Sequence, residues 1–218
     1  MPFNFLKIRN GQVAGRRAIP VPPDEDFRRT VIDAVAAGAR ISALPVWREN
    51  VNGPLNMLAG LSIPRSGDLL LAACRLPEPW QALTPDCPAA HWFEREIAET
   101  WHARPEGHPW LKPIRFHTCY AAGRSGPEPV IGITDFFRLD GAEVHEVAVG
   151  PVHAGIIEPG HFRFQCHGED VHHLEISLGY QHRGIEQALA GGPNARTLHY
   201  METLAGDTTI GHATAYAE

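Results

Sequence analysis

Histidine is the residue type that offers this chain the most chemistry. Nine of its 13 histidines lie between His145 and His212. Neutral imidazole is a common metal ligand, and its titration near neutrality also suits proton transfer. The spacing argues against a metal site, because no His-x-His or His-x-x-x-His pattern occurs. Strand alternation would also place His172 and His173 on opposite faces. An independent metalloenzyme is therefore only the third of three hypotheses for this sequence.

The cysteines give no metal-binding pattern either. Cys74, Cys87, Cys119 and Cys166 are spaced by 13, 32 and 47 residues, so no Cys-x-x-Cys pair exists for a zinc ribbon or an iron–sulfur loop. The first residues lack the apolar core of a secretory signal, which makes a disulfide framework unexpected. We predict four reduced thiols, most of them buried.

Composition and charge exclude several classes of protein. The 218 residues are 44% hydrophobic and 20% charged, enough for a real core. No apolar run approaches the ~20 residues that cross a bilayer. Lys+Arg 19 against Asp+Glu 25 gives a net charge of −6, which argues against a nucleic-acid surface.

Hydrophobic periodicity predicts an α+β fold for the first half of the chain. Apolar spacing and the glycine at position 38 indicate a helix over 27–37 with Asp24 as its N-cap. A second helix is expected to begin at Pro88 with Asp86 as its cap. Strands are predicted at the N-terminus and over 41–47, 55–63 and 68–74, the last two joined by a turn at 64–67.

The second half of the chain predicts a small antiparallel sheet that leads into helices. A strand over 144–149 is followed by a hairpin over 162–178, whose alternation gives one apolar and one polar face. Helices are expected over 184–189 and from 194 to the end. The Gly- and Pro-rich stretch after Tyr120 is typical of a linker. We therefore predict an α+β domain over 1–122, a linker over 123–140 and a second domain over 141–218.

Two segments resemble known families. His91-Trp92-Phe93-Glu94-Arg95-Glu96, followed by Gly107-His108-Pro109-Trp110-Leu111, resembles the hallmark of the C subunit of respiratory complex I, a component of its peripheral arm. The segments 149–164 and 178–186, which include Gly-Pro-Val-His and His-Arg-Gly-Ile-Glu, resemble the start of the catalytic subunit of group 4 nickel–iron hydrogenases and its homologue, the D subunit of complex I. The order matches fused chains of these families. The resemblance implies a domain like that peripheral-arm component, followed by the N-terminal fragment of a hydrogenase-like domain.

The resemblance also implies roles for particular residues. His153 matches the first histidine of a turn that faces the quinone cavity in complex I, and Glu158 matches a proton-relaying glutamate of hydrogenases. The second histidine of the complex I pattern corresponds here to Ile157. Contacts with neighbouring subunits are implied for a polar helix face and two motif loops, comprising Glu94, Arg95, Glu96, His108, His182, Arg183 and Glu186.

The sequence departs from these families where they bind metal. Hydrogenases have two cysteine ligands of nickel and iron after this region, and the matching positions here are Ala205 and Thr208. A methyl and a hydroxyl group do not replace soft thiolates. In complex I a quinone-binding tyrosine lies close to this position, where this chain has Gly206. We therefore expect no metal or cofactor in this chain, no hydrogen chemistry and little support for quinone binding.

The leading hypothesis is a subunit, or a subunit fragment, of an assembly like NADH:quinone oxidoreductase (complex I) or a membrane-bound hydrogenase, without catalysis when isolated. Its expected partners are an iron–sulfur small subunit and other redox subunits that carry iron–sulfur clusters and, where used, quinone. Through them it would lie on the cytoplasmic inner face of the cell membrane. The second hypothesis is an oligomerising assembly or binding protein derived from such a subunit, for which exposed apolar surface would favour a homodimer.

Overall fold

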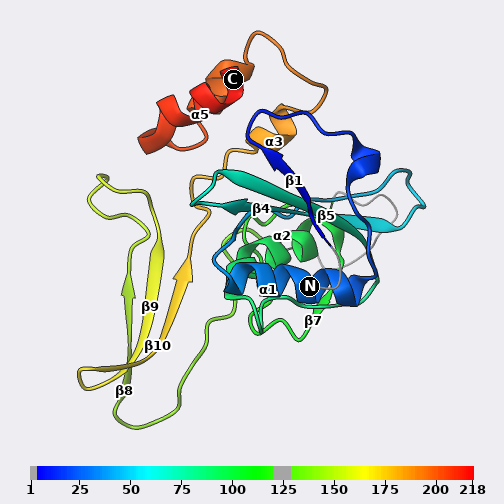
Figure 1. The fold of residues 1–218 in the computed structure, drawn as a ribbon. Coiled ribbons are helices and arrows are strands. Elements are labelled where there is room, and N and C mark those ends of the chain that lie inside the picture. Colours follow the sequence, from blue (N-terminus) through cyan, green and yellow to red (C-terminus); the bar gives the residue numbers. More distant parts are fainter. Residues whose placement is uncertain (1–3, 120–128) are drawn as a thin grey trace. The chain divides into compact units, whose positions relative to one another are not determined.

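The structure is a computed structural model that describes residues 4–119 and 129–218. The chain divides into two compact units, residues 1–135 and 136–218. Part of the linker expected over 123–140 lies outside the described residues, and the division after Asp135 lies in its described part. Both units combine helices with antiparallel strands, which confirms the predicted α+β class (Figure 1).

The first unit is built on a five-stranded antiparallel sheet in the order β1-β5-β4-β2, with β3 also paired to β4. The central pair, β4 and β5, is joined by the predicted turn and stays in register from Leu55 opposite Leu76 to Ile63 opposite Asp68. The predicted strand over 41–47 is divided in two by Leu44 and Pro45. The strands are β1 (Leu6–Arg9), β2 (Arg40–Ala43), β3 (Val46–Trp47), β4 (Leu55–Ile63) and β5 (Asp68–Leu76).

Helix α1 (Asp24–Ala36) ends as its sequence predicts and begins differently. At its C-terminus, Gly38 has φ +99° and its N–H donates to Val35 O, while the N–H of Ala39 donates to Ala34 O. This is the Schellman arrangement, in which a residue with positive φ follows the helix. The prediction that Asp24 caps the helix is wrong, because Pro23 is the N-cap and Asp24 lies in the first turn.

Helix α2 (His91–Trp101) follows a short 3-10 turn, η2 (Pro88–Ala90). The predicted cap, Asp86, does not cap it; Cys87 is the N-cap of η2, and the Asp86 carboxylate forms an ion pair with Arg28. After Trp101 the chain reverses through His102, whose φ of 49° is left-handed. The remaining short elements of this unit are η1 (Arg16–Ala18), β6 (Trp80–Gln81) and β7 (Pro105–Glu106), the last two paired in parallel.

The core of the first unit lies between one face of the sheet and the two helices (Figure 1). Alternate residues of β4 and β5 point toward α1 and α2, as the period of a strand requires. Phe27 and Val31 of α1 and Ile97 of α2 join this cluster and are at most 4% exposed. From the two strands the cluster takes Leu55, Met57, Ala59, Leu61, Ala72, Cys74 and Leu76.

The second unit contains a three-stranded antiparallel sheet in the order β10-β9-β8. The strand over 144–149 and the hairpin are confirmed as β8 (Val144–Val149), β9 (His161–His167) and β10 (Asp170–Ser177). The predicted alternation is interrupted at His172, where the register shifts between Val171 and His173. The apolar face remains regular, with Val147, Phe164 and Leu174 in one row and Val149, Phe162 and Ile176 in the next.

Helices end the second unit. The predicted helix over 184–189 is α3 (Ile185–Ala188), but the helix expected from 194 to the end is two helices, α4 (Thr197–Glu202) and α5 (Thr209–Ala217), separated by the 3-10 turn η3 (Gly206–Thr208). The Thr209 hydroxyl donates to Glu202 O and Gly206 O, which stabilises this break. Among the described residues, no helix has the length and apolar character to cross a membrane.

Replacement of a core leucine tests this account of the first unit. Leu61→Ala should lower the free energy of unfolding by about 2–5 kcal/mol, because a fully buried leucine leaves a cavity. Leu111→Ala, at a side chain that is 43% exposed, should cost less than about 1 kcal/mol. All five tryptophans precede residue 111, so tryptophan fluorescence during denaturant unfolding reports the first unit alone. Equal losses for the two variants would contradict the assigned core.

Candidate functional site

The charged residues of α2 bind the backbone of the loops on either side of the helix. The carboxylate of Glu94 is fully buried and accepts hydrogen bonds from the N–H of Leu83 at 2.6 Å, the N–H of Thr84 at 3.0 Å and the Thr84 hydroxyl at 2.6 Å. Burial raises the pKa of Glu94, and the three donors act against that rise. This carboxylate therefore fixes the loop that leads into α2.

Glu99 does the same for the loop after α2. Its carboxylate is 9% exposed and accepts the N–H groups of Ile114, Arg115 and His117 at 2.8, 3.1 and 2.8 Å. Glu99 was not predicted as a functional residue, because no local pattern in the sequence indicates which loop its carboxylate binds.

Arg95 and Glu96 complete this set of loop contacts. Arg95 is 6% exposed and donates to the carbonyls of Lys112 and Pro113 at 2.7 and 2.9 Å, while its guanidinium lies 4.7 Å from the centre of the Trp92 ring. Glu96 forms an ion pair with Arg115 and is less buried. The prediction that Glu94, Arg95 and Glu96 form one polar helix face is wrong for Glu94 and Arg95, because both are buried and hold neighbouring loops.

His108 lies in an aromatic cluster at the start of α2. The N–H of Trp110 donates to its Nδ1 at 3.0 Å, so Nε2 carries the proton and faces His91 O at 3.4 Å. Its ring centre lies 5.2 Å from that of His91. Burial lowers the pKa of His108 to about 4, and the carbonyl of His91 opposes part of this shift. Burial and the nearby Arg95 also lower the pKa of His91. These two imidazoles are neutral at physiological pH.

The two proposed proton carriers, His153 and Glu158, lie in different environments. His153 is half-buried, and its Nε2 lies 2.8 Å from Gly160 O, which closes the loop between β8 and β9. Glu158 is exposed on the same loop. The closed cavity that a proton relay needs is therefore not formed around Glu158 by the described residues. In this chain His153 holds a loop.

Glycine is required where this loop leaves β8. Gly150 has φ +82°, and a Cβ there would lie 2.2 Å from Gly160 O and 2.7 Å from His153 Nε2. The tight closure projects apolar side chains outward, since Val152, Ile156 and Ile157 are 72%, 86% and 62% exposed. Sequence analysis identified the loop by its resemblance but not this exposed apolar tip.

The His-Arg-Gly-Ile-Glu segment is at the surface of the second unit. His182, Arg183 and Glu186 are all exposed, and Arg183 donates to Thr203 O at 2.9 Å. This bond ties the segment before α3 to the end of α4. The three side chains therefore lie where a partner could reach them, and their predicted contacts with neighbouring subunits remain a prediction.

The positions that match hydrogenase metal ligands do not fit a metal ion. Ala205 precedes η3 and Thr208 is exposed within it, so neither offers a thiolate. Across residues 4–119 and 129–218, no three His, Cys, Asp or Glu side chains come together as a set that could hold a metal. Cys74, Cys87 and Cys166 are buried free thiols, and Cys119 is partly exposed. Burial raises the pKa of Cys74 to about 12, which keeps that thiol protonated.

Parts of several known proteins are similar in sequence to this chain. The chain is 28% identical over 152 residues to formate hydrogenlyase subunit 5 of Escherichia coli and 28% identical over 149 residues to hydrogenase-4 component G of the same organism. These matches cover 63% and 62% of this chain. The chain is similar to hydrogenase subunits. A shorter match of 42 residues, 43% identical, is to the carbon monoxide-induced hydrogenase of Rhodospirillum rubrum and covers 19% of this chain and 12% of that protein. No protein-family model matches the sequence.

The match spans only part of these relatives. It covers 27% of the length of each of the two E. coli proteins. The similarity supports the hydrogenase-like part of the resemblance, whereas the separate resemblance of the first half to the peripheral-arm component of complex I stays a prediction. The predicted complex I relationship of the second half likewise rests on the motifs.

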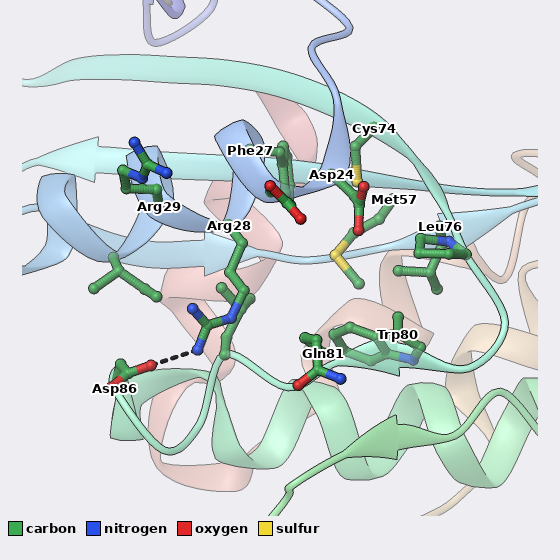
Figure 2. Close-up of a pocket in the computed structure, with 14 residues that line it drawn as sticks. Asp24, Phe27, Arg28, Arg29, Met57, Cys74, Leu76, Trp80, Gln81 and Asp86 are labelled. Carbon is green, nitrogen blue, oxygen red and sulfur yellow. Dashed lines mark hydrogen bonds and ion pairs between the residues drawn. The ribbon is translucent and has the colours of Figure 1, made fainter. Parts of the chain in front are cut away.

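A pocket of about 600 Å³ in the first unit was not predicted. It lies between α1 and the segment 76–86, over a floor that includes Met57, Cys74 and Trp80 (Figure 2). Arg28 crosses it from α1, donating from Nε to Ala82 O at 3.1 Å and forming an ion pair with Asp86. In size it matches a small-molecule site, but Arg28 and Asp86 fix the 82–86 loop and Gln81 donates to Glu106.

Removal of one carboxylate charge tests the role of Glu99. Glu99→Gln should lower the free energy of unfolding by about 1–3 kcal/mol, because an amide offers one acceptor and leaves a backbone N–H without a partner. Hydrogen exchange at the amides of 114–117 should become faster. Glu96→Gln, the matched control, removes only an ion pair and should cost less than about 1 kcal/mol. Unchanged exchange in Glu99→Gln would contradict the assigned bonds.

His108 gives the first unit a pH-dependent stability. Its folded pKa of about 4 lies below the ordinary value of 6.5, so the unfolded chain binds the extra proton first. The stability that neutral His108 contributes is present above pH 6.5 and is lost as the pH falls toward 4. The raised pKa of Glu94 has the opposite effect, because its contribution is lost as the pH rises.

Comparison with His108→Asn isolates this effect. An asparagine carbonyl can accept the Trp110 N–H but does not titrate, so the variant should lose less stability than the unmodified chain between pH 6.5 and pH 4. Tryptophan fluorescence during urea unfolding at a series of pH values measures the difference. Identical pH slopes for the two proteins would show that His108 does not titrate as described.

Proposed function

We propose that this chain is a docking subunit, or a part of one, in a membrane-bound hydrogenase-like electron-transfer assembly and that it has no catalysis of its own. The observation that carries the proposal is the similarity to two proteins named as a subunit and a component of hydrogenase systems, over more than 60% of this chain. A hydrogenase-like assembly is favoured over an NADH:quinone oxidoreductase because these relatives are named for a formate hydrogenlyase and a hydrogenase.

The absence of catalysis is inferred from the chemistry of four side chains. Ala205 and Thr208 stand where the resembling hydrogenases have cysteine ligands, and neither side chain supplies a soft donor. Glu158 is exposed and His153 binds a backbone carbonyl, so neither has the surroundings of a relay residue. We infer that iron–sulfur clusters and any quinone are held by neighbouring subunits.

The proposed contact surface belongs to the second unit. His182, Arg183 and Glu186 offer both signs of charge on an exposed segment, and the loop between β8 and β9 exposes three large aliphatic side chains. Exposed aliphatic anchors and exposed charged groups are both typical of protein interfaces. The proposed partner is an iron–sulfur small subunit, through which the chain would associate with the inner face of the cell membrane.

Co-expression with an iron–sulfur small subunit of a membrane-bound hydrogenase tests the proposal. The two should purify together, with iron, sulfide and visible absorbance in the complex and none in this chain alone. Arg183→Glu should weaken the complex by about tenfold or more, which is ~1.4 kcal/mol, because it reverses a charge at the proposed interface.

Arg65→Glu is the matched control for this experiment. Arg65 is exposed in the β4–β5 turn of the first unit, outside the proposed surface, and its reversal should leave the affinity unchanged. Circular dichroism must show that Arg183→Glu is folded, since this side chain also bonds to Thr203 O. Equal affinities for the two variants would exclude this surface, and failure of the unmodified proteins to associate would exclude the docking role.

A further inference from the structure

Among the residues that the structure describes, β8 is an edge strand with no strand paired to its outer side. It ends the sheet order β10-β9-β8, and five of its six residues are exposed. Its sequence, Val-His-Glu-Val-Ala-Val, has no proline or lysine. Val147 and Val149 are 41% and 42% exposed. An exposed edge of this kind is a template for another strand, unless a bulge, an unpaired charge or a covering segment blocks it. The one carboxylate of β8, on Glu146, is paired with Arg163.

The opposite edge of the sheet is blocked. On β10 the register shifts at His172, and a bulge twists an edge away from further pairing. Next to it, the N–H of Phe137 donates to Glu175, and the Phe137 ring lies 4.2 Å from that of His173. By contrast, β8 pairs with β9 without any shift from Val144 to Val149. The unprotected edge is therefore β8.

We propose that β8 pairs antiparallel with β8 of a second copy of this chain, with Val147 opposite Val147. Two identical antiparallel strands are related by a twofold axis. If this axis passes through a residue, the apolar sides of both strands lie on the same face of the sheet; if it passes between two residues, they lie on opposite faces. Within Val144–Val149, an axis at Glu146 or at Val147 allows five paired residues, and an axis at His145 or at Ala148 allows three. The choice is therefore between Glu146 and Val147.

Charge decides between these two registers. An axis at Glu146 places the two Glu146 carboxylates directly opposite each other, and like charges in a cross-strand pair are destabilising. Arg163 beside Glu146 holds the pKa of that carboxyl below its usual range, so it is ionised at neutral pH. An axis at Val147 instead pairs Glu146 with Ala148 and His145 with Val149, so no two like charges meet.

The resulting six-stranded sheet has one continuous apolar face. Val147 and Val149 of each copy lie in rows with Phe164 and Phe162, so pairing joins the apolar rows of the two copies across the axis. Edge pairing alone buries less area than the ~1,200–2,000 Å² of a stable interface, so the pair exchanges with monomer. This inference goes beyond the proposed docking role and does not depend on it.

Disulfide trapping in the full chain tests both the pairing and its register. In a Cys119→Ser background, Val147→Cys should form a disulfide-linked dimer under mild oxidation at least ~10-fold faster than Val171→Cys, because pairing raises the local thiol concentration. Val171 is the matched control, since it is 54% exposed on the blocked edge. Mixing His145→Cys with Val149→Cys should give the mixed dimer. Equal rates at Val147 and Val171, or no mixed dimer from His145→Cys and Val149→Cys, would overturn the proposal.

Sedimentation of the unmodified chain gives a second measurement that needs no cysteine variant. The sedimentation coefficient should rise with protein concentration, and Val147→Lys should remove the rise because two ammonium groups would then face each other. Val171→Lys should leave it unchanged. A sedimentation coefficient that does not depend on concentration, or one that responds equally to both substitutions, would rule out pairing through β8.

Discussion

Buried carboxylates on one short helix determine the shape of the first unit. Glu94 and Glu99 together accept five backbone N–H groups and one hydroxyl, from the loop before α2 and the loop after it. A carboxylate is worth burying only when its oxygens are bonded, and a loop without regular structure needs acceptors for its N–H groups. The carboxylates accept the loop N–H groups, and the loop N–H groups satisfy the carboxylates. The segments 83–84 and 114–117 therefore have defined positions although they belong to neither sheet nor helix.

The burial of these carboxylates also changes how the Glu-Arg-Glu motif of α2 is interpreted. The Glu-Arg-Glu sequence looks like a solvated helix face, because charged residues are rarely buried without partners. Here Glu94 and Arg95 are buried with backbone partners, while Glu96 is held by Arg115 at the surface. Any contact of Glu94 or Arg95 with another protein therefore has to act through the loops that these two residues position.

The regular elements were predictable from sequence because their signals are local. The register of β4 and β5, the Schellman end of α1 at Gly38 and the strands of the second unit all follow from periodicity and turn residues. Long-range partners were not predictable. Asp86 was expected to cap a helix but meets Arg28, 58 residues away, and the carboxylate of Glu99 bonds to a loop 15–18 residues further on. Such bonds depend on tertiary placement, which spacing does not encode.

In the first unit the apolar face of the sheet is covered, whereas in the second unit the polar face of the sheet is the better covered one. The polar side of its sheet contains the buried Gln165 and Glu175, each 3% exposed, and Phe136 lies there against the guanidinium of Arg163. The apolar side leaves Leu174 and Ile176 more than a third exposed. A sheet that covers its polar side and exposes aliphatic residues gains stability when that apolar side is buried against another surface. Association through this apolar side would therefore stabilise the second unit, whereas the first unit buries its own core.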